Sequence, residues 1–546
     1  MTVGEVFDFV IVGAGSAGCV LAARLSEESS NKVLLLEAGG SDRSIFIQMP
    51  TALSIPMNTK KYNWGYHTEP EPHLGGRRMH CPRGKVLGGS SSINGMVYVR
   101  GNAMDFESWA ADGATGWSYA DVLPYFRKSE TSSRGGDDYR GDTGPQHTTT
   151  GRMKNPLYQA FMDAGVQAGH AFTEDTHGYR QDGVGLMDMT VRDGVRASTA
   201  NEYLKPALSR PNLKVRTGVV VSRILFDGKR ATGVVYRKGG TEVTVNVARE
   251  VIVSSGPIAS PQLLMVSGIG DAAVLSEHGI ETVNHLPGVG QNLQDHLEFY
   301  FQQACTQPIS LYGALNPFAK LMIGIRWILT RKGLGATNHF EAGGFIRSRP
   351  DVEWPDLQYH FLPAAMSYDG NAVAEGHGFQ AHIGPMRSKS RGRVKLTSSD
   401  MRDHPGILFN YMSHEDDWVE MRASVRLTRE IFAQKAFDPY RGKELAPGEN
   451  VQSDDEIDAF IRDAVESAYH PCGTCRMGSG DGAVVDPETR VHGVSGLRVV
   501  DSSIMPTITT GNLNAPTIML AEKAADMILG RTPLPASNAP FYRYAG

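Results

Sequence analysis

The sequence predicts an α/β fold, α+β overall, in which a Rossmann-like nucleotide-binding domain carries an inserted second domain. Phe7–Val12 is typical of a buried parallel strand and runs directly into the glycine-rich turn Gly13-Ala-Gly-Ser-Ala-Gly18. A further strand and helix, at Leu497–Asp501 and about 516–529, are expected to return to the same sheet. The chain has 546 residues, which exceeds one ordinary core and indicates two or more domains.

The elements after the first turn continue this pattern. A helix is expected over about Ala17–Ser26 and a second strand over Lys32–Leu36, which completes a strand–turn–helix–strand unit. Asn212–Ala248 alternates and turns at two glycine-containing pairs, so we expect a β-meander there. Glu250–Ser254 is expected to form another buried strand. Thr131–Thr150 is rich in Gly, Asp, Ser and Thr and is expected to be a surface loop.

The first glycine motif has the residue types that a dinucleotide requires. Gly13 permits the tight turn, Gly15 lets a pyrophosphate approach the backbone, and Gly18 lets the helix pack closely on the strand. The free N–H groups at the helix N-terminus then face the anion. Glu37 follows the second strand and suits a carboxylate that accepts hydrogen bonds from ribose hydroxyls. Glu37-Ala-Gly-Gly40 resembles flavin enzymes more than nicotinamide enzymes, so FAD is the expected cofactor.

The middle of the chain, Phe301–Val465, is rich in Trp, Tyr, His and Met and has fewer glycine-rich turns. We therefore expect a second, substrate-binding domain that covers the cofactor and is built on an antiparallel sheet flanked by helices. The expected cofactor-binding domain is discontinuous and comprises residues 1–155, 196–300 and 468–546. Residues 156–195 and 301–467 are assigned to the substrate-binding domain.

Composition excludes several classes of function. The net charge is −5 and no long basic run occurs, so nucleic acid is not an expected partner. No apolar run is long enough to span a bilayer. Phe318–Thr330 mixes aromatic, apolar and basic residues, which suits a helix in a membrane interface, although an ordinary amphipathic helix packed on the protein is the favoured interpretation. The five scattered cysteines indicate a reducing compartment rather than a disulfide framework.

Two C-terminal segments carry the candidate chemistry. His470 lies in Ala468-Tyr-His-Pro-Cys-Gly-Thr-Cys475, and Asn512 lies in Gly511-Asn-Leu-Asn514. A histidine with a near-neutral pKa can accept the hydroxyl proton of an alcohol, although a lone histidine is more often structural. His470, Cys472 and Cys475 also offer three metal ligands, but no second cluster matches them, so no metal site is predicted.

A second glycine-rich element, Arg83–Val97, contains Gly-Gly-Ser-Ser-Ser-Ile-Asn-Gly. Glycines and serines at this density let backbone amides approach a flat or anionic ligand. An irregular surface loop is the alternative interpretation.

The chain resembles the glucose–methanol–choline oxidoreductase family from about Phe7 to Ile528. Long strings carry the resemblance: Tyr62-Asn-Trp-Gly-Tyr-His-Thr-Glu-Pro-Glu-Pro72, Asn338-His-Phe-Glu-Ala-Gly-Gly-Phe-Ile-Arg347, His414-Glu-Asp-Asp-Trp418 and His470-Pro-Cys-Gly-Thr-Cys475. The resemblance implies FAD in the discontinuous domain and an alcohol under the inserted one.

The resemblance also implies roles for individual residues. His470 matches the family's active-site histidine and would take the hydroxyl proton while the α-carbon gives a hydride to flavin N5. Asn512 matches its polar partner and would stabilise the developing alkoxide. Ile93 stands where related choline oxidases attach FAD to a histidine, so FAD is expected to bind non-covalently. The other expected cofactor contacts are Ser16, Ala38, Gly89, Asn94, Gly95, Met96, Val97, Val221, Asp501 and Asn514.

The resemblance to the choline-oxidising members implies choline as substrate, oxidised to betaine aldehyde and onward to glycine betaine. A quaternary ammonium is recognised by aromatic faces and a carboxylate. Glu341 matches the carboxylate position, and Trp64 and Tyr469 match aromatic positions. Arg387 falls where those members carry a further histidine, and no catalytic role is assigned to it. His382 lies nearby in the sequence and could compensate.

Two other functions remain open. One is oxidation of an uncharged alcohol, and the other is cyanohydrin cleavage, which some family members catalyse without using FAD for redox. The resemblance implies a quinone or another electron acceptor as partner. It also implies possible peripheral membrane contact, with the protein in the cytoplasm or on the cytoplasmic side of the inner membrane.

Overall fold

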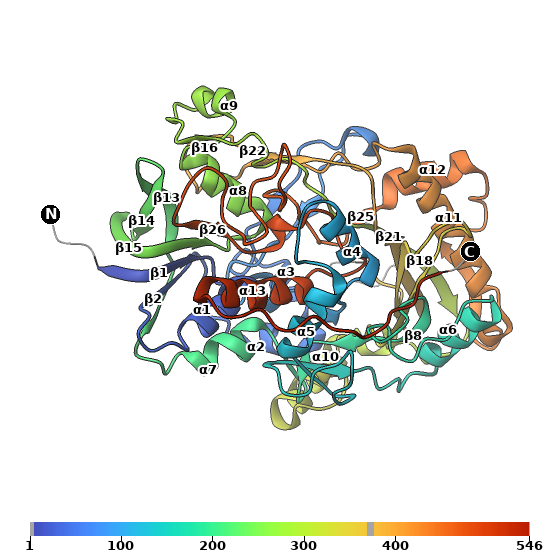
Figure 1. Ribbon diagram of the computed structural model, residues 1–546. Helices are drawn as coiled ribbons and strands as arrows, with labels where there is room; N and C mark the ends of the chain where they lie inside the picture. The colour runs from blue at the N-terminus through green and yellow to red at the C-terminus, as the bar shows by residue number, and fades with distance from the viewer. Residues whose placement is uncertain (1–4, 368–375, 545–546) are drawn as a thin grey trace.

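The computed structural model describes residues 5–367 and 376–544. Two large sheets organise the chain (Figure 1), one carrying β1, β2 and β15 and the other carrying β18 and β21. The helix at the C-terminal end, α13 (Asn514–Leu529), lies with α1 (Ser16–Leu25) on the first sheet.

The first sheet has the strand order β12-β2-β1-β15-β14-β13, with β26 beside β15. Its strands are β1 (Val6–Val12), β2 (Val33–Glu37), β12 (Leu213–Thr217), β13 (Val220–Asp227), β14 (Arg230–Lys238), β15 (Thr241–Val253) and β26 (Leu497–Val499). β12, β2, β1 and β26 run parallel to their neighbours, as the glycine-rich turn predicted. This confirms the Rossmann-like part of the predicted fold.

The structure corrects two boundaries in this sheet. The expected meander and the expected strand Glu250–Ser254 share one strand, β15, which is antiparallel to β14 over Thr241–Asn246 and parallel to β1 further along. β12 pairs in parallel with β2, so it belongs to the nucleotide-binding part and not to the meander. The sequence did not separate the two because both contain alternating apolar residues, and only the pairing distinguishes them.

Apolar residues cover both faces of β1. Phe9 and Ile11 pack in one core cluster with side chains of α1 and α13, while Val10 and Val12 belong to the larger core cluster on the opposite face. Strands buried on both faces are typical of parallel sheets with crossover helices. This arrangement brings the carboxyl ends of β1 and β2 to one edge, next to the N-terminus of α1.

The second sheet is antiparallel, in the order β24-β18-β21-β20-β19-β8, with β25 beside β18. Its strands are β8 (Gly183–Leu186), β18 (Leu297–Cys305), β19 (Ala342–Ile346), β20 (Leu357–Leu362), β21 (Gly378–Pro385), β24 (Arg441–Ala446) and β25 (Glu466–Ser467). Contacting helices are α6 (Pro156–Gln167) and α11 (Glu415–Phe432), and α12 (Asp454–Ala464) packs on β18. The predicted antiparallel sheet flanked by helices is confirmed, while the residue boundaries of the two domains stay a prediction.

The expected surface loop Thr131–Thr150 is confirmed in its middle and wrong at its two ends. Residues 133–145 form turns and irregular structure and are largely exposed. β6 (Glu130–Ser132) and β7 (Gln146–Thr150) belong to a four-stranded sheet with β5 (Val97–Tyr98) and β9 (Asp188–Met189). Arg140 is the exception among the charged residues of the loop, because its guanidinium is buried against Glu130, Asp175 and Asp188. Composition therefore predicted the exposed loop but not this buried charge network.

Shorter elements connect the sheets. These are α2 (Ile45–Gln48), η1 (Pro50–Ala52), α3 (Ser54–Met57), α4 (Ala103–Ala111), α5 (Tyr119–Ser129), α7 (Lys205–Ala207), α8 (Gly256–Val266), α9 (Ala272–Glu277) and α10 (Pro317–Thr330).

Candidate active site

A large cavity is lined by residues of both sheets. Its empty volume is about 2020 Å³, including the space open to solvent at its mouth. The first sheet contributes the end of β1 and the glycine-rich turn, and the second contributes Glu298, His360 and His382 from β18, β20 and β21. The cavity thus joins the glycine-rich turn of one sheet to titratable side chains of the other in a single space.

The glycine motif forms the expected cradle. Gly13 has φ +102°, and a Cβ there would lie 2.5 Å from the Ser254 carbonyl oxygen. A Cβ on Gly18 would lie 1.9 Å from the Gly13 carbonyl oxygen, so Gly18 serves helix packing and does not line the cavity. Gly15 does line the cavity, and the nearest atom to a Cβ there would be 3.9 Å away. The protein itself has room for a side chain at Gly15, so the missing Cβ leaves that space to a ligand.

Glu37 lies at the end of β2 with its carboxylate held by backbone donors. It accepts hydrogen bonds from the N–H groups of Ala14 (2.9 Å) and Gly39 (2.7 Å). Burial raises the pKa of this carboxyl to about 7, against the effect of these two hydrogen bonds. Glu37 lines the cavity, and each of its oxygens keeps a lone pair for a ribose hydroxyl.

The other expected cofactor contacts surround the same cavity. The Ser16 hydroxyl donates to the Asn514 side-chain oxygen at 2.7 Å, which ties the N-terminus of α1 to that of α13. Asp501 accepts from the Gly256 N–H and the Ser260 hydroxyl. The further lining residues among the expected set are Ala38, Gly89, Asn94, Gly95, Met96, Val97 and Val221. Two helix N-termini and a glycine cradle in one cavity fit the diphosphate of a dinucleotide.

His470 and Asn512 meet in the cavity wall. The Asn512 side-chain nitrogen lies 3.0 Å from His470 Nε2, and the Gln358 amide donates to the Asn512 oxygen at 3.2 Å. Because the Asn512 oxygen accepts from Gln358, the N–H₂ group of Asn512 is the end that faces His470. The His470 backbone N–H donates to Asp295 Oδ1 at 2.6 Å, which fixes the segment that carries the ring.

A second histidine sets the tautomer of the first. His296 Nε2 lies 2.9 Å from the Met386 carbonyl oxygen, which can only accept, so Nε2 carries the proton. His296 Nδ1 is then an acceptor in the neutral ring, and it lies 3.0 Å from His470 Nδ1. His470 must therefore donate from Nδ1, which leaves its Nε2 lone pair beside Asn512. This is the nitrogen that a base requires.

The electrostatic surroundings keep both rings neutral. Burial, together with the neighbouring His296, His360 and Arg83, holds the pKa of His470 well below its ordinary value. Burial lowers the pKa of His296 to about 4. At neutral pH His470 is consequently unprotonated and able to accept a proton.

Glu298 is the carboxylate that the second sheet contributes to the cavity, and the expectation for Glu341 is corrected. Glu341 does not line the cavity. Its Oε2 accepts from the N–H groups of Arg152 (2.9 Å) and Met153 (2.7 Å), and its Oε1 accepts from the Thr337 hydroxyl (2.8 Å). These contacts give Glu341 a structural role in holding the chain after β7.

Glu298 lies in the cavity wall with its Oε1 3.3 Å from His382 Nδ1. The expected aromatic residues Trp64 and Tyr469 line the same cavity, together with Phe340. The buried Nδ1 atom of His360, another lining residue, has no hydrogen-bond partner within the described residues.

Sequence reasoning missed Glu298 and His296, although one signal was available. Gln294-Asp-His-Leu-Glu298 places three titratable residues within five positions at the start of β18. Glu298 lies in β18 and lines the cavity, whereas His296 directly precedes the strand and contacts His470.

Arg387 is not among the residues that line the cavity. Its guanidinium is 4.1 Å from the Trp354 ring centroid and donates to the Trp354 carbonyl oxygen at 2.8 Å. His382 does line the cavity, beside Glu298.

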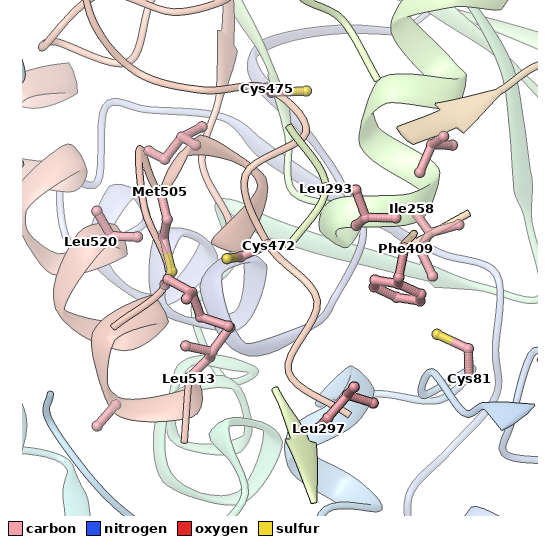
Figure 2. Close-up of a cluster of buried hydrophobic side chains, with 14 of the residues drawn as sticks. Cys81, Ile258, Leu293, Leu297, Phe409, Cys472, Cys475, Met505, Leu513 and Leu520 are labelled. Atoms are coloured by element: carbon pink, nitrogen blue, oxygen red, sulfur yellow. The ribbon is translucent and has the colours of Figure 1, made fainter. Parts of the chain in front are cut away.

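Cys472 and Cys475 lie in the hydrophobic core (Figure 2), where Cys472 is drawn with Leu293 and Met505 around it. Burial raises the pKa of both thiols above the ordinary value, which disfavours the thiolate that a metal needs. Across the described part of the chain, His, Cys, Asp and Glu form no group of three or more that could hold a metal ion.

A glycine-rich cradle that opens beside a neutral histidine with a lone pair on Nε2 suits a nucleotide-dependent oxidoreductase. Models of one family, described as GMC oxidoreductase, match residues 7–298 and 388–521. The chain belongs to this family, and the protein is an FAD-dependent oxidoreductase.

Relatives and solved structures agree with this assignment. The chain is 60% identical over 533 residues to a Brucella ovis protein named oxygen-dependent choline dehydrogenase, covering 97% of each chain. A Vibrio vulnificus protein of the same name is 60% identical over 537 residues, 98% of this chain and 96% of that one. The structure of pyridoxine 4-oxidase from Mesorbium loti has a TM-score of 0.86 at 32% identity over 96% of this chain and 100% of the other. Formate oxidase from Aspergillus oryzae has a TM-score of 0.90 at 28% identity over 97% and 99%.

Proposed function

We propose that the protein oxidises choline to betaine aldehyde. The observation that carries the proposal is the buried carboxylate of Glu298 in a cavity that also holds Trp64, Tyr469 and the pair His470–Asn512. A carboxylate and aromatic faces are the groups that attract a quaternary ammonium, which has no hydrogen to donate. The printed names of the relatives support the same substrate.

Different side chains of the cavity bind the substrate and take part in the reaction. Glu298 and the aromatic rings hold the ammonium end, so that the hydroxyl end reaches His470. His470 Nε2 takes the hydroxyl proton, and the Asn512 N–H₂ group donates to the alcohol oxygen as negative charge develops. Bound FAD supplies the hydride acceptor for the α-carbon. The hydrate of betaine aldehyde presents a similar hydroxyl, so the same residues can serve its oxidation to glycine betaine.

FAD is proposed to bind without a covalent bond. Ile93 lines the cavity directly before Asn94 and has no nucleophilic atom. Denaturation should therefore release all flavin into the soluble fraction, and flavin that stays with the polypeptide would contradict this proposal.

The proposal also covers the electron acceptor of the reduced enzyme and the location of the protein. Within residues 5–367 and 376–544, no helix is both long and apolar enough to cross a membrane. We propose a quinone-type acceptor and peripheral contact with the cytoplasmic side of the inner membrane. Oxygen, which the printed names of the relatives specify, is the alternative acceptor. The rate of reoxidation of reduced enzyme by a quinone, compared with that by air, separates the two.

Oxidation of an uncharged alcohol is the second candidate. One observation favours it, namely the contact between Glu298 and His382, since the imidazole gives the buried carboxylate a polar partner without a cationic substrate. Steady-state rates with choline and with its neutral isostere 3,3-dimethylbutan-1-ol separate the two functions. A clear preference for choline supports the proposal, and equal or better use of the isostere contradicts it.

A further inference from the structure

Helix α10 presents its apolar stripe to solvent. Six of its large apolar side chains are strongly exposed, Phe318 at 73%, Leu321 at 59%, Met322 at 47%, Ile325 at 40%, Ile328 at 50% and Leu329 at 77%. Their spacing of three, four and seven residues places them on one side of the helix. A surface helix of a globular protein normally packs its apolar side against the core. In α10 the apolar side instead faces solvent.

The opposite side of α10 fixes this orientation. Trp327 is buried there against Met49 and Ala52, and its indole N–H donates to the Gly194 carbonyl oxygen at 2.6 Å. The Arg331 guanidinium lies 3.9 Å from the centre of the same ring. The exposed stripe is therefore held outward by specific contacts, and the expectation of an ordinary amphipathic helix packed through its apolar face is wrong.

The charged residues of α10 and of the turn that follows it are all basic. Lys320, Arg326, Arg331 and Lys332 are exposed, and no acidic residue occurs between Pro317 and Lys332. The whole chain, in contrast, carries a net charge of −5.

Two other groups of charged residues lie outside α10. Asp193, the acidic residue beside Gly194, faces Arg192 at 3.8 Å. Lys60 and Lys61, which follow α3, are also exposed. Exposed apolar residues bordered by cations complement an anionic lipid surface.

The segment that anchors α10 also reaches the cofactor cavity. Met49 and Ala52, which contact Trp327, belong to a stretch whose Leu53 and Met57 line the cavity. Ile45, Phe46 and Ile55 in the neighbouring α2 and α3 add exposed apolar surface. Figure 1 shows α10 at the lower edge of the molecule.

We propose that the α10 face, defined as Phe318, Leu321, Met322, Ile325, Ile328 and Leu329, docks on an anionic phospholipid bilayer with α10 lying in the plane of the interface. Docking places the Leu53–Met57 wall of the cavity next to the bilayer, which gives a lipid-soluble acceptor a short route. The inference deepens the peripheral contact proposed above and is independent of the choline reaction.

Flotation of the FAD-loaded protein with vesicles tests this proposal. Vesicles of phosphatidylcholine alone are compared with equal mixtures of phosphatidylcholine and phosphatidylglycerol. The wild type should bind the anionic vesicles more tightly, and added salt should weaken that binding. The double variant Leu321→Ser/Leu329→Ser should lower the partition coefficient about tenfold or more. Val166→Ser/Phe172→Ser, at apolar residues exposed elsewhere, is the matched control and should bind like the wild type.

Three results would overturn the proposal. The first is binding to anionic vesicles that the α10 double variant leaves unchanged, and the second is no binding of the wild type at all. The third is a dimer in solution that the same variant dissociates, which would assign the face to a second copy of the chain. Flavin content and choline oxidation with a soluble acceptor are measured on the same samples. Their retention shows that the variant is folded, and it separates failure of docking from failure of the proposed reaction.

Discussion

Replacing Glu298 by glutamine removes the negative charge of the proposed cation site and keeps the shape of the side chain. Glu298 is 6% exposed, so solvent screens its charge weakly. A quaternary nitrogen about 5 Å from the carboxylate, at an effective dielectric constant of about 20, is stabilised by about 3 kcal/mol. Since about 1.4 kcal/mol corresponds to a factor of ten, kcat/KM for choline should fall about a hundredfold.

The assay compares choline with 3,3-dimethylbutan-1-ol under the same conditions. The isostere has no charge, so Glu298→Gln should change its kcat/KM by less than about threefold. Glu341→Gln is the matched control, because Glu341 is also 6% exposed but lies outside the cavity. It should lower thermal stability by weakening the contacts to Arg152 and Met153, and it should leave the ratio of the two substrates unchanged.

Equal losses for choline and the isostere in Glu298→Gln would refute the cation site. A selective loss of choline activity in Glu341→Gln would instead support the assignment made from sequence and contradict the reassignment made from the structure.

Three further predictions concern the base, the cradle and the buried histidines. His470→Gln should slow flavin reduction by about a thousandfold with little change in choline binding, measured by stopped-flow absorbance; a rate near that of the wild type would exclude the base role. Gly18→Ala places a methyl group 1.9 Å from a backbone oxygen and should yield protein with little bound FAD, measured by flavin-to-protein absorbance, and full occupancy would argue against the close helix packing. Burial lowers the pKa values of His177, His296 and His360 to about 4, so the unfolded chain binds protons below about pH 6.5 that the folded protein does not. Stability should be full above about pH 6.5 and fall toward pH 4, by about 3 kcal/mol for each histidine; an unfolding temperature that does not fall over this range would contradict these shifts.

Features that depend on a few consecutive residues were predictable from the sequence. Gly13, Gly15 and Gly18 serve a strand, a turn and a helix that are adjacent in the chain, and Glu37 ends the next strand. The local sequence pattern was therefore enough to predict how these glycines and Glu37 lie relative to one another. His470 and Asn512 are 42 positions apart, and the resemblance to a family, rather than their spacing, brought them together.

Features that depend on strand pairing were not predictable in the same way. Whether Glu298 or Glu341 faces the cavity depends on the packing of the second sheet on the first, which no local pattern encodes. Glu341 also satisfies its oxygens with the backbone of residues 152 and 153, far away in the sequence. The buried ion pairs of Arg140 likewise join the expected surface loop to Glu130 and Asp188, which lie outside it.

The central claim is that this cavity oxidises choline with electrons passing to FAD. Anaerobic mixing of the purified yellow protein with choline, followed at the long-wavelength absorbance band of the flavin, tests it most directly. The proposed function predicts rapid bleaching with choline that a quinone reverses. Flavin that stays oxidised with choline but bleaches with a neutral alcohol would contradict the substrate, and flavin that stays yellow with every alcohol would contradict the oxidation itself.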